Sequence, residues 1–457
     1  MPWTRDEAQA LAKQILAASK APECNVTLSL ERNEHTRFAA NDVTTAGTAL
    51  DLRITITSRR EGRSGTVTLS ETEPAALARA VARSEELMAV APPDPETVDP
   101  LPPQEYPVID AGYDDGAART GPAQRAAGVK LALDKARATK LDASGFFETD
   151  TTWTAIAGKT GLFGFHRSTQ ASFSTTMRTA DGTGSGWAGD ESPRVAELHP
   201  AELVSRAARK AEASRSPRDL PPGLYTVILE PQAVADLFSA GLGFALAARS
   251  AEEGRSYFSK QGGGTRIGEK VFHESVNLVS DPFDARRPGR PWVGGGGGGG
   301  GGFGFGGLAG GSWGLPARKV TWVENGVLQN LSVDRYWAKK TGRQPVPFAG
   351  GLVLGGGKGT VEDLIAGCER GLVVTRFWYI RSVNAQTMQL TGLTRDGVFL
   401  VEKGKVAGPV NNFRFNESPA TVLKNVEGMS AATRAGNLIV PAIRASGFNF
   451  SSKSDAV

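Results

Sequence analysis

The residues best suited to chemistry are four histidines, and their spacing argues against a histidine-based metal site. They are His35, His166, His199 and His273. No two stand four residues apart, so the HExxH arrangement, in which one helix face presents two histidines to zinc, does not occur. We expect His273, in the extended segment VFHESVNLV, to lie on a surface strand, and His166 to face solvent. The histidines therefore predict no zinc helix of this kind.

Other reactive motifs are incomplete as well. Gly355–Thr360 (GGGKGT) superficially resembles a phosphate-binding loop, but Leu352 occupies the position of its first glycine and Gly359 that of its hydroxyl residue. Thr360 instead predicts the N-cap of a short helix. The chain has no GxSxG motif, and we expect Cys368 to be a small buried residue rather than a nucleophile. Taken alone, the residues form no complete catalytic constellation.

The composition is that of an ordinary globular protein. The 457 residues are 40% hydrophobic and 22% charged, which is enough chain for about three domains. The net charge is only +4, and no Lys/Arg cluster alternates with aromatic residues, which argues against nucleic-acid binding. Cys24 and Cys368 form no CxxC pattern, and neither a secretory segment nor a long apolar run occurs. We expect a cytoplasmic protein with no membrane association.

The predicted fold that holds these residues is α+β, in three domains. Residues 1–90 are expected to form a small unit of a helix, antiparallel strands and a second helix, and residues 107–218 repeat this order. Between them, residues 91–106 contain six prolines and no periodic pattern, which indicates a linker. Residues 219–457 are expected to form a larger, mainly antiparallel β domain.

Two segments organise the C-terminal domain. Residues 231–250 carry apolar side chains almost all round a helix, so we expect this helix to be buried. Residues 369–418 contain four short runs rich in Val, Phe, Trp, Tyr and Thr, which are typical of antiparallel strands. Asp396-Gly397 predicts a turn between two of these strands, and residues 402–405 predict a hairpin tip.

A glycine-rich loop interrupts this domain. Residues 294–314 contain 15 glycines in 21 positions, broken by Phe303, Phe305 and Trp313. Because glycine raises the entropy cost of ordering a segment, a flexible surface loop is the simpler interpretation. An aromatic flap over a site is the alternative, and the sequence leaves both open.

Three C-terminal segments have distinctive sequences. They are Gly371–Tyr379 (GLVVTRFWY), Thr391–Leu400 (TGLTRDGVFL) and Gly408–Phe415 (GPVNNFRF). These segments resemble the TldD/PmbA (TldE) family, which is related to zinc metallopeptidases. Further likenesses, at residues 36–38, 166–187 and 324–328, extend the resemblance over nearly the whole chain. The resemblance implies that a TldD-type and a TldE-type subunit associate into a zinc-dependent peptidase acting on peptides or unfolded segments. An older family label is modulator of DNA gyrase.

The resemblance also implies where a zinc site would lie. A TldD-type subunit carries an HExxxH motif on a helix and a later cysteine. Placing that motif on the buried helix puts Ser239 and Phe244 at the histidines, Ala240 at the glutamate, and Val374 at the cysteine. None of these side chains holds zinc, and none is a base that activates water. The chain therefore resembles the TldE type, with no catalytic or metal residue and no cofactor of its own.

The same replacements carry a structural expectation. Apolar side chains at a former metal site let the helix pack directly on the C-terminal sheet. We therefore expect Phe238, Phe244 and Val374 to be core residues.

The expected partner is a TldD-type subunit that carries the zinc, and the expected substrate is a peptide or unfolded protein. Without that partner, the chain is expected to form a homodimer. An extended peptide commonly adds as a strand to a sheet edge. The residues expected at such a peptide or partner surface are Arg376, Trp378, Tyr379 and Asn411. Two alternatives remain open: a binding or modulator protein without peptidase activity, for a toxin or gyrase-related factor, and an independent hydrolase with an unrecognised site.

Overall fold

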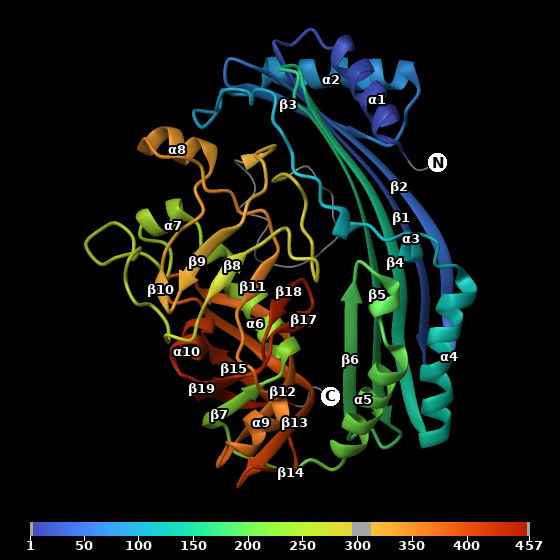
Figure 1. The fold of residues 1–457 in the computed structure, drawn as a ribbon, viewed down its shortest axis with the longest axis vertical. Coiled ribbons are helices and arrows are strands. Elements are labelled where there is room, and N and C mark those ends of the chain that lie inside the picture. The colour runs from blue at the N-terminus through green and yellow to red at the C-terminus, as the bar shows by residue number, and fades with distance from the viewer. Residues whose placement is uncertain (1–2, 295–311, 455–457) are drawn as a thin grey trace.

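The computed structural model describes residues 3–294 and 312–454. A long N-terminal sheet lies beside a C-terminal domain that contains two further sheets (Figure 1). The mixed α+β fold expected from the sequence is confirmed. Most of the glycine-rich loop at residues 294–314, including Phe303 and Phe305, lies outside the described residues.

The N-terminal sheet is antiparallel and has six strands. They are β1 (Glu23–Ala39), β2 (Asp42–Arg60), β3 (Arg63–Leu69), β4 (Leu141–Gly158), β5 (Phe163–Thr179) and β6 (Ser185–Ser192). Their order is β3-β2-β1-β4-β5-β6, because β1 pairs with β2 on one side and with β4 on the other. Residues 1–90 and 107–218, which the sequence separates into two units, thus contribute strands to one hydrogen-bonded sheet.

Helices cover this sheet in two pairs, each on its own apolar cluster. Figure 1 shows α1 (Arg5–Ala18) and α2 (Pro74–Val90) at one end, and α4 (Pro122–Thr139) and α5 (Pro200–Ala213) toward the other. Thr4 begins α1 with the capping box to Glu7 that the sequence indicates. Gly65 of β3 allows α2 to approach closely, since a Cβ there would lie 2.0 Å from the Ser84 carbonyl oxygen.

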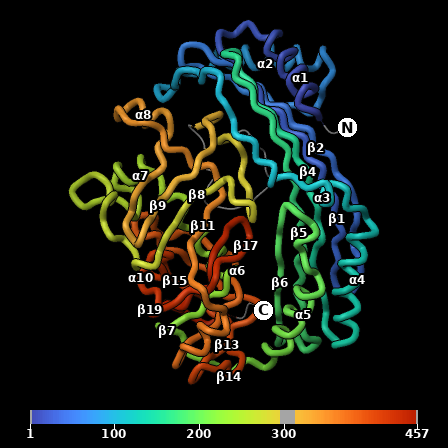
Figure 2. Tube along the Cα trace, viewed as in Figure 1, coloured from blue at the N-terminus to red at the C-terminus, as the bar shows by residue number. Residues whose placement is uncertain are grey.

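The proline-rich segment at residues 91–106 is held in place along the boundary between sheet and C-terminal domain. Figure 2 shows the chain after α2 descending along this boundary toward α3 (Asp115–Ala118). Both Glu96 carboxylate oxygens accept hydrogen bonds from Arg249 at 2.7 Å, and the Tyr106 hydroxyl donates to the Gly314 carbonyl at 2.7 Å. These bonds fix the segment to the C-terminal domain.

Five strands of the C-terminal domain close into a barrel. They are β7 (Gly223–Leu229), β12 (Arg370–Asn384), β13 (Gln389–Glu402), β15 (Asn412–Glu417) and β19 (Ile443–Ser454). The ring β12-β7-β19-β15-β13 closes because β12 pairs with both β7 and β13. Two shorter strands, β14 (Lys405–Val410) and β16 (Val426–Met429), pair onto β13 and β19.

The two turns expected in this region have different outcomes. The hairpin tip at residues 402–405 is confirmed, with Lys403 and Gly404 at φ 51° and 72° between β13 and β14. The expected turn at Asp396-Gly397 is wrong, because both residues lie within β13. Their φ values are 59° and 117°, and β13 gains one residue relative to β12 at this point. Asp396 and Gly397 therefore form a β-bulge.

The second sheet of this domain consists of short strands, in the order β10-β9-β8-β11-β18-β17. They are β10 (Val327–Leu328), β9 (Val320–Glu324), β8 (Leu278–Ser280), β11 (Leu352–Leu354), β18 (Leu438–Val440) and β17 (Thr433–Ala435). The β9–β10 turn has Asn325 and Gly326 at positive φ, which this dipeptide favours. His273 precedes β8 and lies outside any strand, so its expected strand position is wrong.

The predicted buried helix is confirmed as α6 (Pro231–Ala245), and the chain continues into the short α7 (Ala248–Glu252). Phe238 and Leu242 of α6 are fully buried. The largest apolar cluster of the molecule joins α6 to the barrel and to the second sheet. Three further helices are α8 (Arg335–Thr341), α9 (Val361–Ala366) and α10 (Pro419–Lys424).

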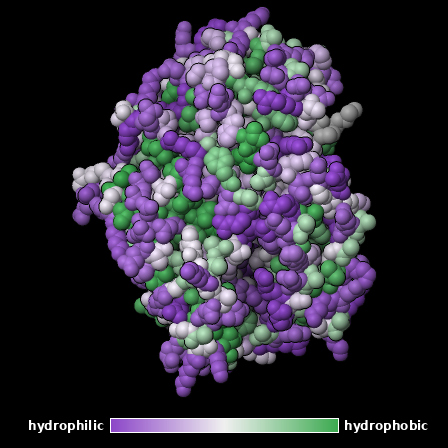
Figure 3. Space-filling model, in the orientation of Figure 1, coloured by the Kyte–Doolittle hydropathy of each residue, from purple (hydrophilic) through white to green (hydrophobic). Residues whose placement is uncertain are grey.

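The face shown in Figure 3 is mostly hydrophilic, with hydrophobic residues in small groups. Among the described residues, no helix has the length and apolar character needed to cross a membrane.

Candidate functional site

The candidate site lies where α6 packs along β12. The backbone N–H of Glu230 donates to the Val374 carbonyl at 3.1 Å, which fixes the start of the helix beside the strand. Most of α6 is buried, but Asp236, Ala240 and Phe244 follow one another at i, i+4 and i+8 and form a less buried stripe. This stripe includes two of the three positions at which the family resemblance leads us to expect the HExxxH motif.

The expected core positions are confirmed in part. Val374 and Phe238 are fully buried. The expectation for Phe244 is wrong, since it remains 52% exposed. The reason is its position on the open stripe of α6, one residue before the helix ends, where neither barrel nor second sheet covers it.

These positions do not fit a zinc ion. The Ser239 hydroxyl donates to Asn437 Oδ1 at 3.1 Å, and Ala240, Phe244 and Val374 carry no ligand atom. Zinc in proteins is held by imidazole, thiolate or carboxylate groups, and none of these four side chains carries one. Across residues 3–294 and 312–454, no three His, Cys, Asp or Glu side chains group closely enough to hold a metal ion.

Asp236 is the principal ionisable group of the open stripe. Its Oδ1 accepts a hydrogen bond from Gln232 Nε2 at 2.8 Å, and its Oδ2 accepts one from the backbone N–H of Phe377 at 2.9 Å. Burial raises the pKa of Asp236 to about 6, against the opposing effects of Arg376 and of both hydrogen bonds, and the charge of Asp396 raises it further. The carboxyl therefore links α6 to β12 and titrates near neutral pH.

Arg376 and Asp396 join this carboxyl on the barrel side. Arg376 Nη1 lies 3.8 Å from Asp396 Oδ2, and Asp396 is 2% exposed. The bulge in β13 turns the Asp396 side chain toward the N-terminal sheet, where its Oδ1 accepts a hydrogen bond from the Ser185 hydroxyl of β6 at 2.7 Å. The site therefore lies at the boundary between the sheet and the barrel.

Aromatic rings and arginines alternate outward from this boundary. The Arg376 guanidinium lies 4.6 Å from the ring centroid of Trp187 on β6 and 5.8 Å from that of Trp378. Arg395, the cross-strand partner of Arg376, lies 4.8 Å from the Trp378 ring. These are cation–π distances, so the rings hold the guanidinium planes. Trp378 itself is 46% exposed.

Tyr379 extends the exposed aromatic surface. It is 59% exposed, has a φ of 54°, and its ring lies 4.3 Å from the Arg381 guanidinium. A positive φ is unfavourable for a bulky residue, so this part of β12 stores strain. Arg376, Trp378 and Tyr379 thus lie on one strand segment. Asn411 has a different environment: its Oδ1 accepts from the backbone N–H of Leu220 at 2.6 Å.

Further ion pairs join the sheet to the C-terminal domain beside the site. Lys210 of α5 pairs with Glu230 and donates to Thr375 Oγ1 at 3.3 Å. Arg434 contacts Asp190 of β6 at 3.1 Å and Glu197 at 2.5 Å. Hydrogen bonds from two arginines and Ser192 lower the pKa of Glu197 to about 2, against the opposing effect of burial. The boundary is therefore polar and extensively bonded.

His166 differs from its expected environment. It is only 7% exposed, and its ring lies 6.3 Å from that of Trp292, so the expectation of a solvent-facing side chain is wrong. Burial, with a smaller effect from Arg290, lowers its pKa to about 4. The alternation along β5 identified its face of the sheet correctly, but the C-terminal domain covers that face.

Profiles of known protein families match two long stretches of the chain. The PmbA/TldA metallopeptidase C-terminal domain matches residues 222–452, and the PmbA/TldA metallopeptidase central domain matches residues 119–215. The chain belongs to the PmbA/TldD metallopeptidase family. The C-terminal match contains every residue of the α6–β12 site, and the central match contains Ser185 and Trp187 of β6.

Solved structures share this fold over nearly the full chain. TldE from Thermococcus kodakarensis has a TM-score of 0.82 at 19% identity, covering 97% of this chain and 99% of TldE. A proposed modulator of DNA gyrase from Bacteroides thetaiotaomicron has a TM-score of 0.82 at 18% identity, with coverage of 98% and 99%. In sequence, a metalloprotease of Methanothermobacter thermautotrophicus is 24% identical over 251 residues, 51% of this chain and about half (49%) of that relative's length.

Several residues of this site were not anticipated. The sequence does contain a signal for Asp236. It is the only charged residue among residues 231–247, and a lone carboxylate in an apolar helix requires partners. No comparable sequence signal marks Ser185, Asp396 or Lys210. Their roles depend on how the N-terminal sheet meets the barrel, which is a contact between segments about 200 residues apart.

Proposed function

We propose that this chain is a non-catalytic, TldE-type subunit of a zinc-dependent peptidase complex that acts on peptides or unfolded segments in the cytoplasm. Its partner is a TldD-type subunit that carries the zinc. The observation that carries the proposal is the α6–β12 site itself. The resemblance places the HExxxH and cysteine positions here at Ser239, Ala240, Phe244 and Val374, and these side chains supply neither zinc ligands nor a general base.

The barrel surface beside this site supports a role in association. Trp378 and Tyr379 are exposed aromatic residues, and Phe244 is exposed on the neighbouring helix. Exposed aromatic residues together with arginines are typical of the central part of protein interfaces. In the proposed complex this surface contacts the partner or lines the passage that a peptide follows.

The charged boundary contributes rigidity rather than reaction chemistry. Asp236 accepts a hydrogen bond from the Phe377 backbone, and Asp396 accepts one from Ser185 and lies 3.8 Å from Arg376, so these contacts hold β12 in one position relative to α6 and β6. A rigid strand can present its exposed side chains with little entropy loss on binding.

Co-expression with a relative that carries HExxxH tests the proposal. We expect the two chains to co-purify and to hydrolyse unfolded peptides together, and a chelator to abolish this activity. Either chain alone should be inactive. Sustained hydrolysis by this chain alone, insensitive to chelators, would instead support an independent hydrolase.

A second candidate is a binding protein that modulates another factor without any peptidase. It is favoured by the similarity to the Bacteroides protein described as a modulator of DNA gyrase. This candidate predicts a chain that is monodisperse alone and that does not co-purify with an HExxxH relative. The same co-expression experiment therefore separates the two.

A further inference from the structure

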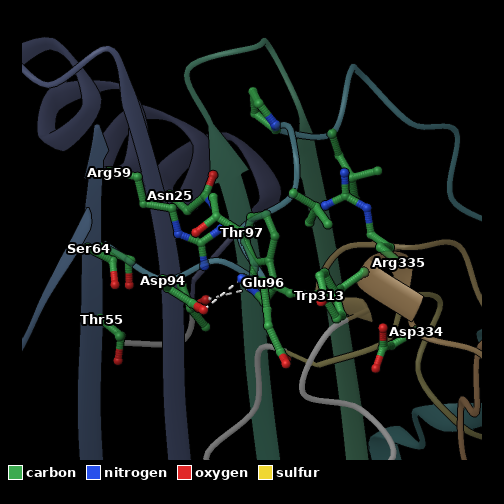
Figure 4. Close-up of a pocket in the computed structure, with 16 residues that line it drawn as sticks. Asn25, Thr55, Arg59, Ser64, Asp94, Glu96, Thr97, Trp313, Asp334 and Arg335 are labelled. Atoms are coloured by element: carbon green, nitrogen blue, oxygen red, sulfur yellow. Dashed lines mark hydrogen bonds between the residues drawn. The ribbon is translucent and has the colours of Figure 1, made fainter. Parts of the chain in front are cut away.

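A cavity of about 410 Å³ lies away from the α6–β12 site, where three parts of the molecule meet (Figure 4). Strands β1 to β3 form its floor, the proline-rich segment around Asp94–Leu101 forms one wall, and Trp313 with the start of α8 forms another. Ligand sites in proteins commonly have volumes of roughly 300–1,000 Å³. The cavity therefore has the size to take a small molecule.

Two arginines line this cavity without a carboxylate partner. Among the described residues, the Arg59 side chain makes no hydrogen bond or ion pair, and the Arg335 side chain donates only to the backbone carbonyl of Asp99. Burial lowers the pKa of Arg335, and the positive charge of Arg59 lowers it further, while Asp99 and Glu23 oppose this. Both guanidinium groups line the same cavity, and the charge of Arg59 disfavours the charged form of Arg335.

Three carboxylates, Asp94, Glu96 and Asp334, also line the cavity, and each accepts hydrogen bonds from other groups. Glu96 accepts both hydrogen bonds of Arg249, and Asp94 Oδ1 accepts from the Glu96 backbone N–H at 2.9 Å. Asp334 caps α8 by accepting from the Trp337 N–H at 2.7 Å. Glu23 stands opposite Arg59 in the β1–β2 register, but no ion pair joins them. Among the described residues, neither guanidinium group of the lining forms an ion pair, while the charges of Asp94 and Asp334 stay in the lining and Glu23 Oε2 is buried without a hydrogen-bond partner.

The remaining lining offers hydroxyl groups and one flat ring. Thr27, Thr55 and Thr57 present hydroxyls from the floor. The Trp313 Nε1–H donates to Thr27 Oγ1 at 3.3 Å, which fixes the indole as a wall. Figure 4 shows Arg59 and Arg335 on opposite sides of the drawn pocket, with Trp313 on the side of Arg335.

We propose that this cavity binds a small molecule bearing a phosphate or carboxylate group, with Arg59 and Arg335 holding the anion and Trp313 contacting the remainder. Guanidinium groups pair with both anions through two parallel hydrogen bonds. The bound molecule would connect the N-terminal sheet, the proline-rich segment and the C-terminal domain. The proposal does not depend on the peptidase-subunit role.

Titration calorimetry of the full chain with pyrophosphate, and separately with citrate, tests the proposal. We expect at least one of them to bind, and Arg59→Gln and Arg335→Gln each to weaken that binding at least about tenfold, as loss of a charge-assisted contact does. Arg60→Gln is the matched control, because Arg60 is exposed, neighbours Arg59 and does not line the cavity. Binding of pyrophosphate alone identifies a phosphate ligand, and binding of citrate alone a carboxylate.

Two results would overturn the proposal. One is the absence of binding by both anions at millimolar concentration. The other is binding that both arginine variants retain unchanged. A second readout guards against misfolding: each variant should unfold at the same denaturant concentration as the wild type in the absence of anion, and only the wild type and Arg60→Gln should be stabilised when anion is added.

Discussion

The Ser185 hydroxyl of β6 donates a hydrogen bond to Asp396 Oδ1 of β13 at 2.7 Å, across the boundary between the N-terminal sheet and the C-terminal barrel. Both residues are buried, and Asp396 reaches the boundary because a bulge bends its strand. The bond therefore fixes the position of the N-terminal sheet relative to the C-terminal barrel beside α6.

Ser185→Ala should destabilise the protein by about 1–3 kcal/mol, because it leaves a buried carboxylate oxygen without its donor. Chemical denaturation measures this change. Ser70→Ala is the control, since Ser70 is exposed, and it should alter the free energy of unfolding by less than about 0.5 kcal/mol. Equal stability of the two variants would show that the boundary bond contributes nothing.

Asp236 gives the stability of the protein a pH dependence. Its pKa is about 6 in the folded chain against an ordinary value of 3.8, so the folded state binds more protons between these pH values. The contribution of Asp236 to the free energy of unfolding therefore falls as pH rises from about 4 to 6, by about 1.4 kcal/mol for each unit by which its folded pKa exceeds the ordinary value. Asp236→Asn should remove this dependence.

Denaturation curves at pH 4.5 and pH 7 check this prediction. The wild type should lose stability relative to Asp236→Asn between the two pH values. Asp6→Asn, at an exposed position near the start of α1, serves as the comparison and should leave the pH dependence of the wild type unchanged. A wild type that gains stability relative to Asp236→Asn on the same pH change would contradict the raised pKa.

Trp378 and Tyr379 should matter for association more than for folding. Trp378→Ala and Tyr379→Gly are each expected to weaken binding to the zinc-bearing partner at least about tenfold, as loss of an interface anchor does. Tyr379→Gly also relieves a positive φ, so the free energy of unfolding should change by less than about 1 kcal/mol. Surface plasmon resonance measures binding, with Val90→Ala, an exposed hydrophobic residue on α2, as control. Undiminished binding by both variants would remove this surface from the proposed interface.

The sequence indicated local structure well where a local signal existed. The apolar helix that begins at Pro231, the capping residues Thr4 and Thr360, and the hairpin at Lys403-Gly404 have short-range causes, and each is present, whereas the turn expected at Asp396-Gly397 is not. The same patterns could not show that β1 pairs with β4, because that pairing joins segments about 120 residues apart. Phe244 and His166 were misplaced for the same reason, since their exposure depends on where the two halves of the molecule meet.

The candidate site was likewise predictable from the sequence only in part. Its location on α6 and β12 came from the family resemblance, which also led us to expect the motif positions at Ser239, Ala240, Phe244 and Val374. The sequence could not predict which residues lie around Arg376, because Trp187, Asp236 and Asp396 come from three separate segments of the chain. A bulge at Asp396-Gly397 rather than a turn decides which side chain reaches Ser185.

Metal analysis of the purified chain tests the central claim most directly. After expression in zinc-containing medium and removal of weakly bound metal, the chain alone should contain far less than one equivalent of zinc, because positions 239, 240, 244 and 374 supply no ligand. Tight zinc at one equivalent per chain would contradict the account.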